Sequence, residues 1–301
     1  MTACIAQSLN DRSDRRIGLL AAYGRFPMLF AEAARRAGFE VVCVAIRDAA
    51  SPELANFVDS FCWVGIAQLG GMIRSFRRAG VRRVVMAGKV AKTQIYAPWR
   101  IFRFLPDWRF ARTWLSIGRG DRKDDSMLLA LVREFHRDGI DIVSALDFCP
   151  ELLVKSGHLT RRRPTDSESR DIEFGWTLAK EMGRLDVGQT VAVKELAVLA
   201  VEAIEGTDRC IQRAGELCPS GGFTVVKVAK PQQDMRFDVP TIGPDTIETL
   251  HRAGARVLAV EADKTILLDS QETQRLADRY GLTIVAVRPD EMAAMQSRRA
   301  G

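Results

Sequence analysis

Short apolar runs and amphipathic stretches alternate along the first half of the chain. The apolar runs have the length of strands, and the stretches between them repeat apolar residues with the spacing of one helix face. Runs that are apolar throughout are typical of strands covered on both faces, as in a parallel sheet. The predicted strands are 17–22, 41–46, 62–64, 84–87 and 140–145, and the predicted helices are 28–37, 66–79 and 126–138. The pattern therefore predicts a parallel sheet flanked by helices.

A polar segment at residues 155–169 then interrupts the alternation. It contains Gly157, the run Arg161-Arg162-Arg163-Pro164 and several Ser, Thr and Asp residues, which favours a domain boundary. Beyond it we predict helices at 167–182, 207–217, 246–253 and 271–280, and strands at 189–194, 223–229, 257–260 and 283–287. The sequence thus predicts an α/β protein with a Rossmann-like parallel-sheet domain at 1–153 and a C-terminal α/β domain at 154–301.

The charge balance and the apolar runs limit the partners and the location. Lys and Arg exceed Asp and Glu by 44 to 38, which gives a modest positive field suited to phosphorylated small molecules, an anionic membrane surface or nucleic acid. The first 16 residues are polar, and no later run reaches the roughly 20 apolar residues of a spanning helix. We therefore expect a cytoplasmic protein.

Cysteine and histidine spacing argues against two kinds of hydrolase. The six cysteines are scattered without a C-x-x-C pair, so we expect buried thiols rather than zinc ligands. The three histidines, His136, His158 and His251, are isolated from one another and from any nucleophile pattern. Zinc-dependent and triad hydrolases are therefore not expected.

The loop after the first predicted strand lacks the spaced glycines of a dinucleotide site. It supplies only Gly24, followed by Arg25. At the carboxyl end of a strand these two residues suit a phosphate or a nucleotide, and an ordinary strand-to-helix turn explains them equally well. Gly88, Lys89 and Val90 close a later strand at the same edge of the sheet, so Lys89 is expected to face the same crevice.

In the segment 202–208, the acids Glu205 and Asp208 and the hydroxyl of Thr207 lie at a glycine turn before a predicted helix. Glu205, Gly206, Thr207 and Asp208 fit a metal-supporting and substrate-binding turn. The alternative is structural, because Thr207 or Asp208 would also serve as a helix N-cap.

The segment 227–244 is the densest polar stretch beside an apolar strand. Its basic residues Lys227, Lys230 and Arg236 suit phosphate oxygens, while Asp234 and Asp238 can hold Mg²⁺ or accept a proton from water. On one straight strand the backbones of the two aspartates would stand roughly 13 Å apart, too far to chelate one ion. Either the chain bends there, or one aspartate binds metal and the other pairs with Arg236. A third interpretation is an ion-paired edge strand without chemistry.

Two further segments carry open alternatives. Asp124 and Asp125 precede a predicted helix, where they could cap it or reach a metal. The stretch 96–114 interleaves aromatic residues with arginines and holds three of the five tryptophans. It suits a lipid headgroup or acyl chain, nucleic-acid stacking, or packing between domains.

Together, the turn Glu205-Gly206-Thr207-Asp208 and the run Lys-Pro-x-Gln-Asp-x-Arg-x-Asp-x-Pro-Thr-Ile-Gly resemble the UDP-2,3-diacylglucosamine pyrophosphatases of the LpxI type, from lipid A biosynthesis. The second motif is long and specific. The likeness extends over most of the chain, and only the polar extension before Arg16 looks additional. It also covers the motifs at 24–27, 88–90, 124–125 and 187–189.

The resemblance implies Mg²⁺-dependent (or Mn²⁺-dependent) hydrolysis of UDP-2,3-diacylglucosamine to UMP and 2,3-diacylglucosamine 1-phosphate, in a cleft between the two domains. It implies a homodimer that works at the inner membrane surface, with a lipid-linked UDP-sugar as substrate and no nucleic-acid partner. The expected catalytic residues are Asp234, Asp238, Asp208, Lys227, Lys230 and Arg236. The expected metal ligands are Asp234, Asp208, Glu205 and Asp125. The expected substrate-binding residues are Gly24, Arg25, Gly88, Lys89, Val90, Gln189, Thr190, Gly206, Thr207 and Gln233.

Two other classes of function compete with this hypothesis. A non-catalytic sensor of nucleotide sugars or anionic lipids would explain the basic charge and the aromatic stretch, and it predicts binding without turnover. An NAD-linked oxidoreductase would explain a Rossmann-like sheet, but the missing glycines weaken it.

Overall fold

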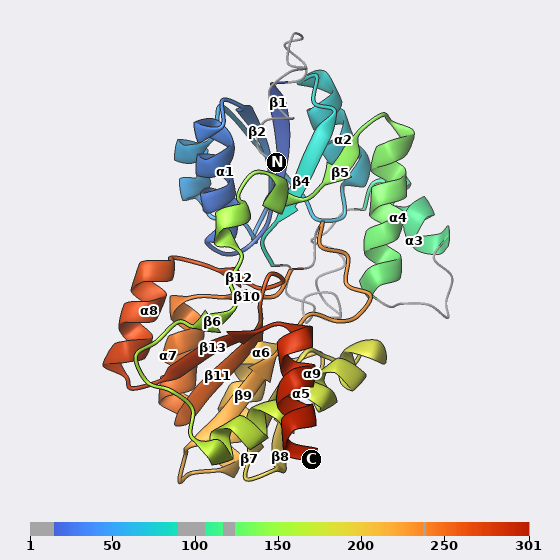
Figure 1. The fold of residues 1–301 in the computed structure, drawn as a ribbon. Coiled ribbons are helices and arrows are strands. Elements are labelled where there is room, and N and C mark those ends of the chain that lie inside the picture. Colours follow the sequence, from blue (N-terminus) through green and yellow to red (C-terminus); the bar gives the residue numbers. More distant parts are fainter. Residues whose placement is uncertain (1–14, 90–105, 117–123, 237–238, 301) are drawn as a thin grey trace. The chain divides into compact units, whose positions relative to one another are not determined.

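The computed structural model describes residues 15–89, 106–116, 124–236 and 239–300. The chain divides into two compact units, Met1–Pro150 and Glu151–Gly301. Each unit is an α/β layer structure with its own sheet (Figure 1). None of the helices in the described ranges has the length and apolar character needed to cross a membrane.

The N-terminal unit contains a sheet whose strand order is β3-β2-β1-β4-β5. Every pairing in it is parallel, and the inner strand β1 lies between β2 and β4. The strands are β1 (Arg16–Ala21), β2 (Glu40–Ile46), β3 (Ser60–Val64), β4 (Arg83–Ala87) and β5 (Asp141–Val143). The continuous apolar runs therefore form the predicted parallel sheet, with β1 and β2 almost entirely buried.

Helices cover both faces of this sheet (Figure 1). They are α1 (Phe26–Arg36), α2 (Leu69–Arg78), α3 (Trp108–Ser116) and α4 (Asp124–Arg137), with 3-10 turns at Pro52–Phe57, Ala145–Asp147 and Pro150–Leu152. α1 begins with Pro27 in its first turn, as the sequence predicts. α2 approaches β1 closely at Gly18, where an added Cβ would lie 2.8 Å from the Phe76 ring.

The sheet of the C-terminal unit is mixed, in the order β6-β13-β11-β9-β7-β8. β9, β11 and β13 are parallel, whereas β7 is antiparallel to both of its neighbours. The strands are β6 (Gly157–His158), β7 (Thr190–Lys194), β8 (Ala197–Val201), β9 (Phe223–Lys227), β11 (Ala255–Glu261) and β13 (Thr283–Val287). A separate parallel pair joins β10 (Thr241–Ile242) to β12 (Ile266–Leu267).

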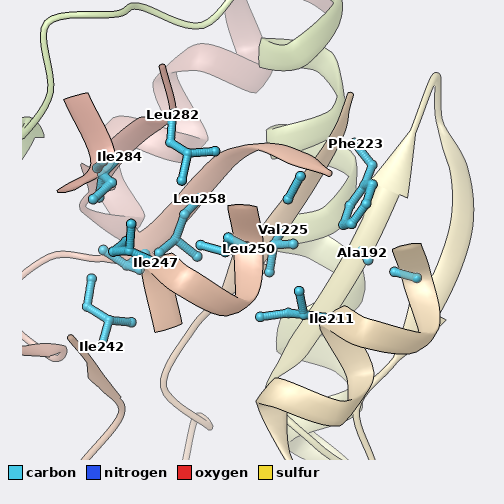
Figure 2. Packing of buried hydrophobic residues seen from close by; sticks show 14 of the residues in the cluster. Ala192, Ile211, Phe223, Val225, Ile242, Ile247, Leu250, Leu258, Leu282 and Ile284 are labelled. Atoms are coloured by element: carbon cyan, nitrogen blue, oxygen red, sulfur yellow. The ribbon is translucent and has the colours of Figure 1, made fainter. Parts of the chain in front are cut away.

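Alternate side chains of this sheet enter two separate cores. Ala192, Val225 and Leu258 pack with apolar residues of the helices on one face, among them Ile211 and Leu250 (Figure 2). The opposite side chains of the same strands pack against α5 and α9. The helices are α5 (Asp166–Arg184), α6 (Thr207–Leu217), α7 (Pro244–Ala253), α8 (Ser270–Arg279) and α9 (Pro289–Ala300). The predicted C-terminal α/β domain is thus confirmed as a three-layer unit.

Strand β8 was not among the predicted elements, and its turn explains why. The β7–β8 turn contains Glu195 and Leu196 at positive φ, 50° and 63°, where Gly or Asn would normally mark a hairpin. The buried Asp171 of α5 accepts hydrogen bonds from both of their backbone N–H groups, at 3.0 and 2.7 Å. The turn is therefore stabilised by the Asp171 carboxylate, which is distant in sequence, and not by a Gly or Asn within the turn.

Candidate active site

The predicted site residues of the C-terminal unit gather at one edge of its sheet. β9 ends at Lys227, and the antiparallel β7 begins opposite it at Thr190. β8 ends beside the start of β7, so the turn at 202–206 and the loop at 228–236 leave the sheet at the same edge. The strand topology therefore brings three separate sequence motifs together.

The turn before α6 is built on a buried carboxylate. Glu202 is 7% exposed, and its Oε1 accepts a hydrogen bond from the Thr207 hydroxyl at 3.1 Å. The Thr207 hydroxyl also lies 3.4 Å from the hydroxyl of the fully buried Thr190. Glu202 N donates to Thr190 O, which pins the turn to the start of β7. The second oxygen, Oε2, is buried without a hydrogen-bond partner among the described residues.

The helix cap differs from the one that the sequence favoured. The N-cap of α6 is Gly206, with φ of 84°, and no side chain of the described residues caps the helix. Thr207 and Asp208 instead lie in the first turn, so the prediction that one of them caps the helix is wrong. The Thr207 hydroxyl is drawn to Glu202. The uncapped N–H groups leave this helix end suited to an anion.

Glu205 and Asp208 occupy different environments within this turn. Glu205 pairs with Arg213 at 2.5 Å and accepts a hydrogen bond from Ala203 N. Partial burial would raise its pKa, but hydrogen bonds from the turn backbone and from Arg213 hold the pKa below its usual value. Asp208 is exposed. The negative charge of Glu205 is thus balanced by Arg213, whereas Asp208 faces solvent.

The start of β7 depends on a close backbone approach. A Cβ added to Gly188 would lie 2.1 Å from the Glu202 carbonyl oxygen, so only glycine fits there. Gln189 O then accepts a hydrogen bond from Val228 N, at the start of the 228–236 loop. Its side-chain Oε1 is buried without a partner among the described residues. The predicted residue Gln189 therefore lies at the site edge with hydrogen-bonding capacity unused.

Lys227 is a buried lysine at the carboxyl end of β9. It is 3% exposed, and its Nζ donates to Thr241 O at 2.9 Å. Because Lys227 alternates with Val225 and Phe223, it lies on the sheet face that α6 and α7 cover. Thr190, its register partner on β7, faces the same way. Lys227 therefore places a positive charge at the end of β9, on the sheet face where α6 begins.

The 228–236 segment is a loop and not a strand, so the straight-strand geometry does not apply. Asp234 and Arg236 form a bidentate pair, with Arg236 Nη2 2.6 Å from Oδ2 and Nε 2.9 Å from Oδ1. Hydrogen bonds from Arg236 hold the pKa of Asp234 below its usual value. Asp234 is therefore an ionised carboxylate with an arginine beside it. Asp238 lies outside the described residues.

Lys230 and Gln233 have structural partners within reach. Lys230 Nζ is 2.5 Å from Asp186 Oδ1, and only 9% of its side chain is exposed. Gln233 Oε1 accepts a hydrogen bond from Lys230 N, which closes a tight turn. These contacts hold the loop in shape, so neither residue is a simple solvent-facing ligand.

In the N-terminal unit, the predicted phosphate residues meet at the carboxyl ends of β1 and β4. Tyr23 and Lys89 form an antiparallel bridge through both backbone N–H groups. Gly88 has φ of 100°, and an added Cβ would lie 2.7 Å from Ala22 C. The chain runs from β1 outward through β2 and returns to β4, so this point is where the strand order reverses. Open α/β sheets bind ligands at such a crevice.

Comparison with known proteins shows the family to which this sequence belongs. The LpxI N-terminal domain model matches residues 16–152, and the LpxI C-terminal domain model matches residues 155–285. The chain belongs to the LpxI family. Both matches begin at or after Arg16, in agreement with the extension expected before that residue.

A curated relative of this LpxI family member is the UDP-2,3-diacylglucosamine pyrophosphatase LpxI of Caulobacter vibrioides (strain ATCC 19089 / CIP 103742 / CB 15). It is 32% identical over 285 residues, covering 92% of this chain and 99% of the relative. Among solved structures, CobK precorrin-6A reductase aligns over 95% of this chain and 96% of its own, with a TM-score of 0.32 and 9% identity. A likeness that weak carries no argument.

The expected metal ligands of this LpxI chain do not form a cluster in the described structure. No group of three or more acidic, histidine or cysteine residues in the described ranges is arranged to hold a metal ion. Asp234 and Glu205 each face an arginine. Asp125 lies in the first turn of α4, with its side chain outside the described structure. Mg²⁺, however, commonly takes only one or two carboxylates and completes its shell with substrate phosphates and water, and the described carboxylates fit that mode.

Most of the described cysteine thiols of this LpxI chain are buried, as the sequence predicts. Cys43, Cys149, Cys210 and Cys218 are buried and form no disulfide among the described residues, and Cys62 is half-buried. Burial raises the pKa of Cys210 to about 12, so its thiol stays protonated at neutral pH. Cys4 and Val90 lie outside the described residues.

Part of the aromatic stretch lies on α3, and its apolar side chains face outward. Trp108 is 81% exposed and Leu115 is 78% exposed. Phe110 and Trp114 stack at 5.9 Å along the same helix. Arg109 ties the helix to Glu134 of α4 at 2.8 Å. The helix is therefore anchored through a polar pair while large apolar groups remain at the surface.

Sequence reasoning did not single out several residues at the site edge. Glu202 belongs to the recognised turn, yet the acids chosen there were Glu205 and Asp208. Asp186, Lys180 and Glu261 lie far from the motifs in sequence, and each of them contacts the segment at 229–230. A single acidic or basic residue at a helix or strand end carries no local signal for such a contact.

Proposed function

We propose that this chain hydrolyses the pyrophosphate bond of UDP-2,3-diacylglucosamine, as a step of lipid A synthesis, and releases UMP and 2,3-diacylglucosamine 1-phosphate. The observation that carries the proposal is the 32% identity to the Caulobacter enzyme along nearly its whole length. The geometry supports the same chemistry, because ionised carboxylates, a buried lysine and an uncapped helix end gather at one sheet edge.

Pyrophosphate hydrolysis needs positive charge around the phosphates and a base or oriented water for attack. We assign phosphate contact to Lys227, Arg236 and the backbone N–H groups in the first turn of α6. Thr207 in that turn and the buried Thr190 at the start of β7 hold this end of the site in shape through their hydroxyl contact at 3.4 Å. Asp234, ionised beside Arg236, orients or deprotonates the water. Substrate that draws Arg236 away would release the carboxylate for this task.

Mg²⁺, or Mn²⁺ in its place, would neutralise phosphate oxygens when it is bound. Asp234 and Asp208 are the described carboxylates best suited to hold it. Glu205 suits the ion less, because Arg213, unlike Arg236, is not assigned to the substrate phosphates and would keep balancing the Glu205 charge when substrate binds. Asp125 and Asp238 remain candidate ligands by sequence.

The β1–β4 crevice of the N-terminal unit is assigned to a phosphate or nucleotide group of the same substrate. The bridge between Tyr23 and Lys89 fixes the loop around Gly24 and Arg25 at this crevice. Arg25 and Lys89 are exposed and positively charged. In a dinucleotide fingerprint, backbone N–H groups of glycines bind the phosphates. Here the side chains of Arg25 and Lys89 would bind them instead.

Lipid contact is assigned to α3, with the membrane surface as the source of substrate. Exposed Trp108 and Leu115 give an apolar surface, and the half-exposed Arg112 side chain adds a cation for anionic headgroups. This proposal makes the protein peripheral at the cytoplasmic side of the inner membrane. The homodimer stays a prediction.

The decisive experiment is an incubation of the purified chain with UDP-2,3-diacylglucosamine in detergent, with Mg²⁺, with Mn²⁺ or with EDTA, followed by detection of UMP. We expect UMP only with a divalent metal, and a large loss in Asp234→Asn. Glu272→Gln on α8 is the matched control, because it removes a carboxylate from an exposed pair with Arg275. Binding without UMP under every metal condition would support the non-catalytic alternative.

A further inference from the structure

The loop that carries Asp234 leaves the sheet beside a fully buried carboxylate. Glu261, at the end of β11, is 0% exposed, and its Oε2 accepts hydrogen bonds from Ala229 N at 2.9 Å and from Lys180 Nζ at 2.5 Å. Lys180 Nζ also donates to Ala229 O at 2.9 Å. Both backbone groups of Ala229 are therefore held by one ion pair between α5 and β11.

The next residues of the loop are held by the end of α5. Lys230 Nζ pairs with Asp186 at 2.5 Å, and both side chains are largely buried. Gly183 lets the helix approach so closely that an added Cβ would lie 3.2 Å from Lys230 Cα. Asp186 itself has φ of 58°, a costly conformation for a residue other than glycine. This strained backbone conformation occurs at the residue whose carboxylate pairs with Lys230.

Buried ion pairs contribute little net stability, since desolvation offsets their attraction. Their geometric effect is larger, because a buried charge is satisfied in only a few arrangements. A fully buried glutamate that binds the backbone N–H and a partly buried lysine that binds the backbone O of the same residue leave that residue little freedom. Since Asp234 lies four positions beyond Lys230, the direction in which the loop leaves the sheet is set at this point.

We infer that Lys180, Asp186 and Glu261 are positioning residues that hold the segment Ala229–Lys230 and thereby aim the Asp234 loop at the substrate. Lys230 belongs to this brace and does not contact the pyrophosphate. The inference rests on the proposed function for its substrate, but the contacts that define the brace exist without it. It revises the expected role of Lys230 and adds three residues that lie outside the sequence motifs.

A double-mutant cycle separates positioning from phosphate binding. Lys230→Met, Asp186→Asn and the double variant are assayed for UMP release, with kcat and KM resolved. A positioning pair predicts that both single variants lower kcat by about tenfold to a hundredfold with KM nearly unchanged, and that the double variant is no worse than either one. A rise in KM for Lys230→Met together with full activity of Asp186→Asn would overturn the inference.

A second measurement needs no substrate. Hydrogen exchange of the peptide covering residues 228–236 is compared in wild type, Glu261→Gln, Lys180→Met and the control Glu272→Gln. We expect faster exchange at this peptide in the first two variants and wild-type exchange in the control. Unchanged exchange in Glu261→Gln and Lys180→Met would contradict the brace. If wild type releases no UMP, the proposed function fails while the exchange result still decides whether the brace exists.

Discussion

The Thr207 hydroxyl donates to Glu202 Oε1 at 3.1 Å, and this contact joins the first turn of α6 to the end of β8. Glu202→Ala would leave the half-buried Thr207 hydroxyl without its acceptor and disturb its contact with the buried Thr190 hydroxyl, and we expect it to lower the free energy of unfolding by about 1–3 kcal/mol. Glu202→Gln keeps an oxygen for Thr207 and is expected to cost less. Urea unfolding followed by circular dichroism measures both.

Glu205, a partly exposed acid of the same turn, provides the control for this prediction. Glu205→Ala removes a carboxylate from the same turn, but its partner Arg213 has 44% of its side chain exposed. We therefore expect a loss below about 1 kcal/mol. Equal losses for Glu202→Ala and Glu205→Ala would show that the buried hydroxyl network does not hold the turn.

Much of the fold was predictable because most of its longer strands are apolar runs in the sequence. The runs that form β1, β2, β4, β9 and β13 are apolar along their length, and their burial follows directly. β8 and the two-residue strands β6, β10 and β12 were not predictable. β8 depends on Asp171 for its turn, and the short strands are defined by pairing alone.

The candidate site was predictable as a list of motifs, but not as a set of contacts. The motif around Lys227 and Asp234 is visible because polar residues directly follow a buried strand. The partners that decide its electrostatics, Arg213 for Glu205 and Asp186 for Lys230, are 8 and 44 residues away in sequence. Their contacts arise from helix and strand packing, which periodicity does not encode.

The Asp234–Arg236 pair makes a pH-dependent contribution to stability. Arg236 lowers the pKa of Asp234 in the folded state, so the pair stabilises the protein above the unfolded-state value of about 3.9. That stabilisation is lost as the pH falls through the lower folded-state pKa. We expect Asp234→Asn to lower the free energy of unfolding by up to about 1 kcal/mol at pH 7, and the difference from wild type to vanish in strong acid. Urea unfolding at pH 7 and at about pH 2 measures this difference between Asp234→Asn and wild type, and an equal difference at both pH values would show that the pair has no pH-dependent role.

The bridge between β1 and β4 predicts unequal effects of two glycine substitutions. Gly88→Ala combines a φ of 100° with a Cβ 2.7 Å from Ala22 C, so the backbone must move and the bridge between Tyr23 and Lys89 is strained. Gly24→Ala has a comparable φ of 115° but meets no atom within 4 Å. We expect Gly24→Ala to cost about 1–3 kcal/mol through backbone strain alone, and Gly88→Ala clearly more. Thermal unfolding of the two variants, compared with wild type, measures the difference, and equal costs would show that close packing at Gly88 is unimportant.

The apolar surface of α3 predicts an effect on lipid substrate without an effect on folding. Trp108 and Leu115 are 81% and 78% exposed, so Trp108→Ser and Leu115→Ser should change the free energy of unfolding by no more than about 0.5 kcal/mol. If α3 contacts the acyl chains or the membrane, both variants turn over vesicle-borne UDP-2,3-diacylglucosamine more slowly and bind anionic vesicles less tightly. Leu217→Ser on α6, 63% exposed, is the matched control, because it removes an exposed leucine from the other unit. Wild-type turnover and vesicle binding in the Trp108 and Leu115 variants would assign these side chains to another role.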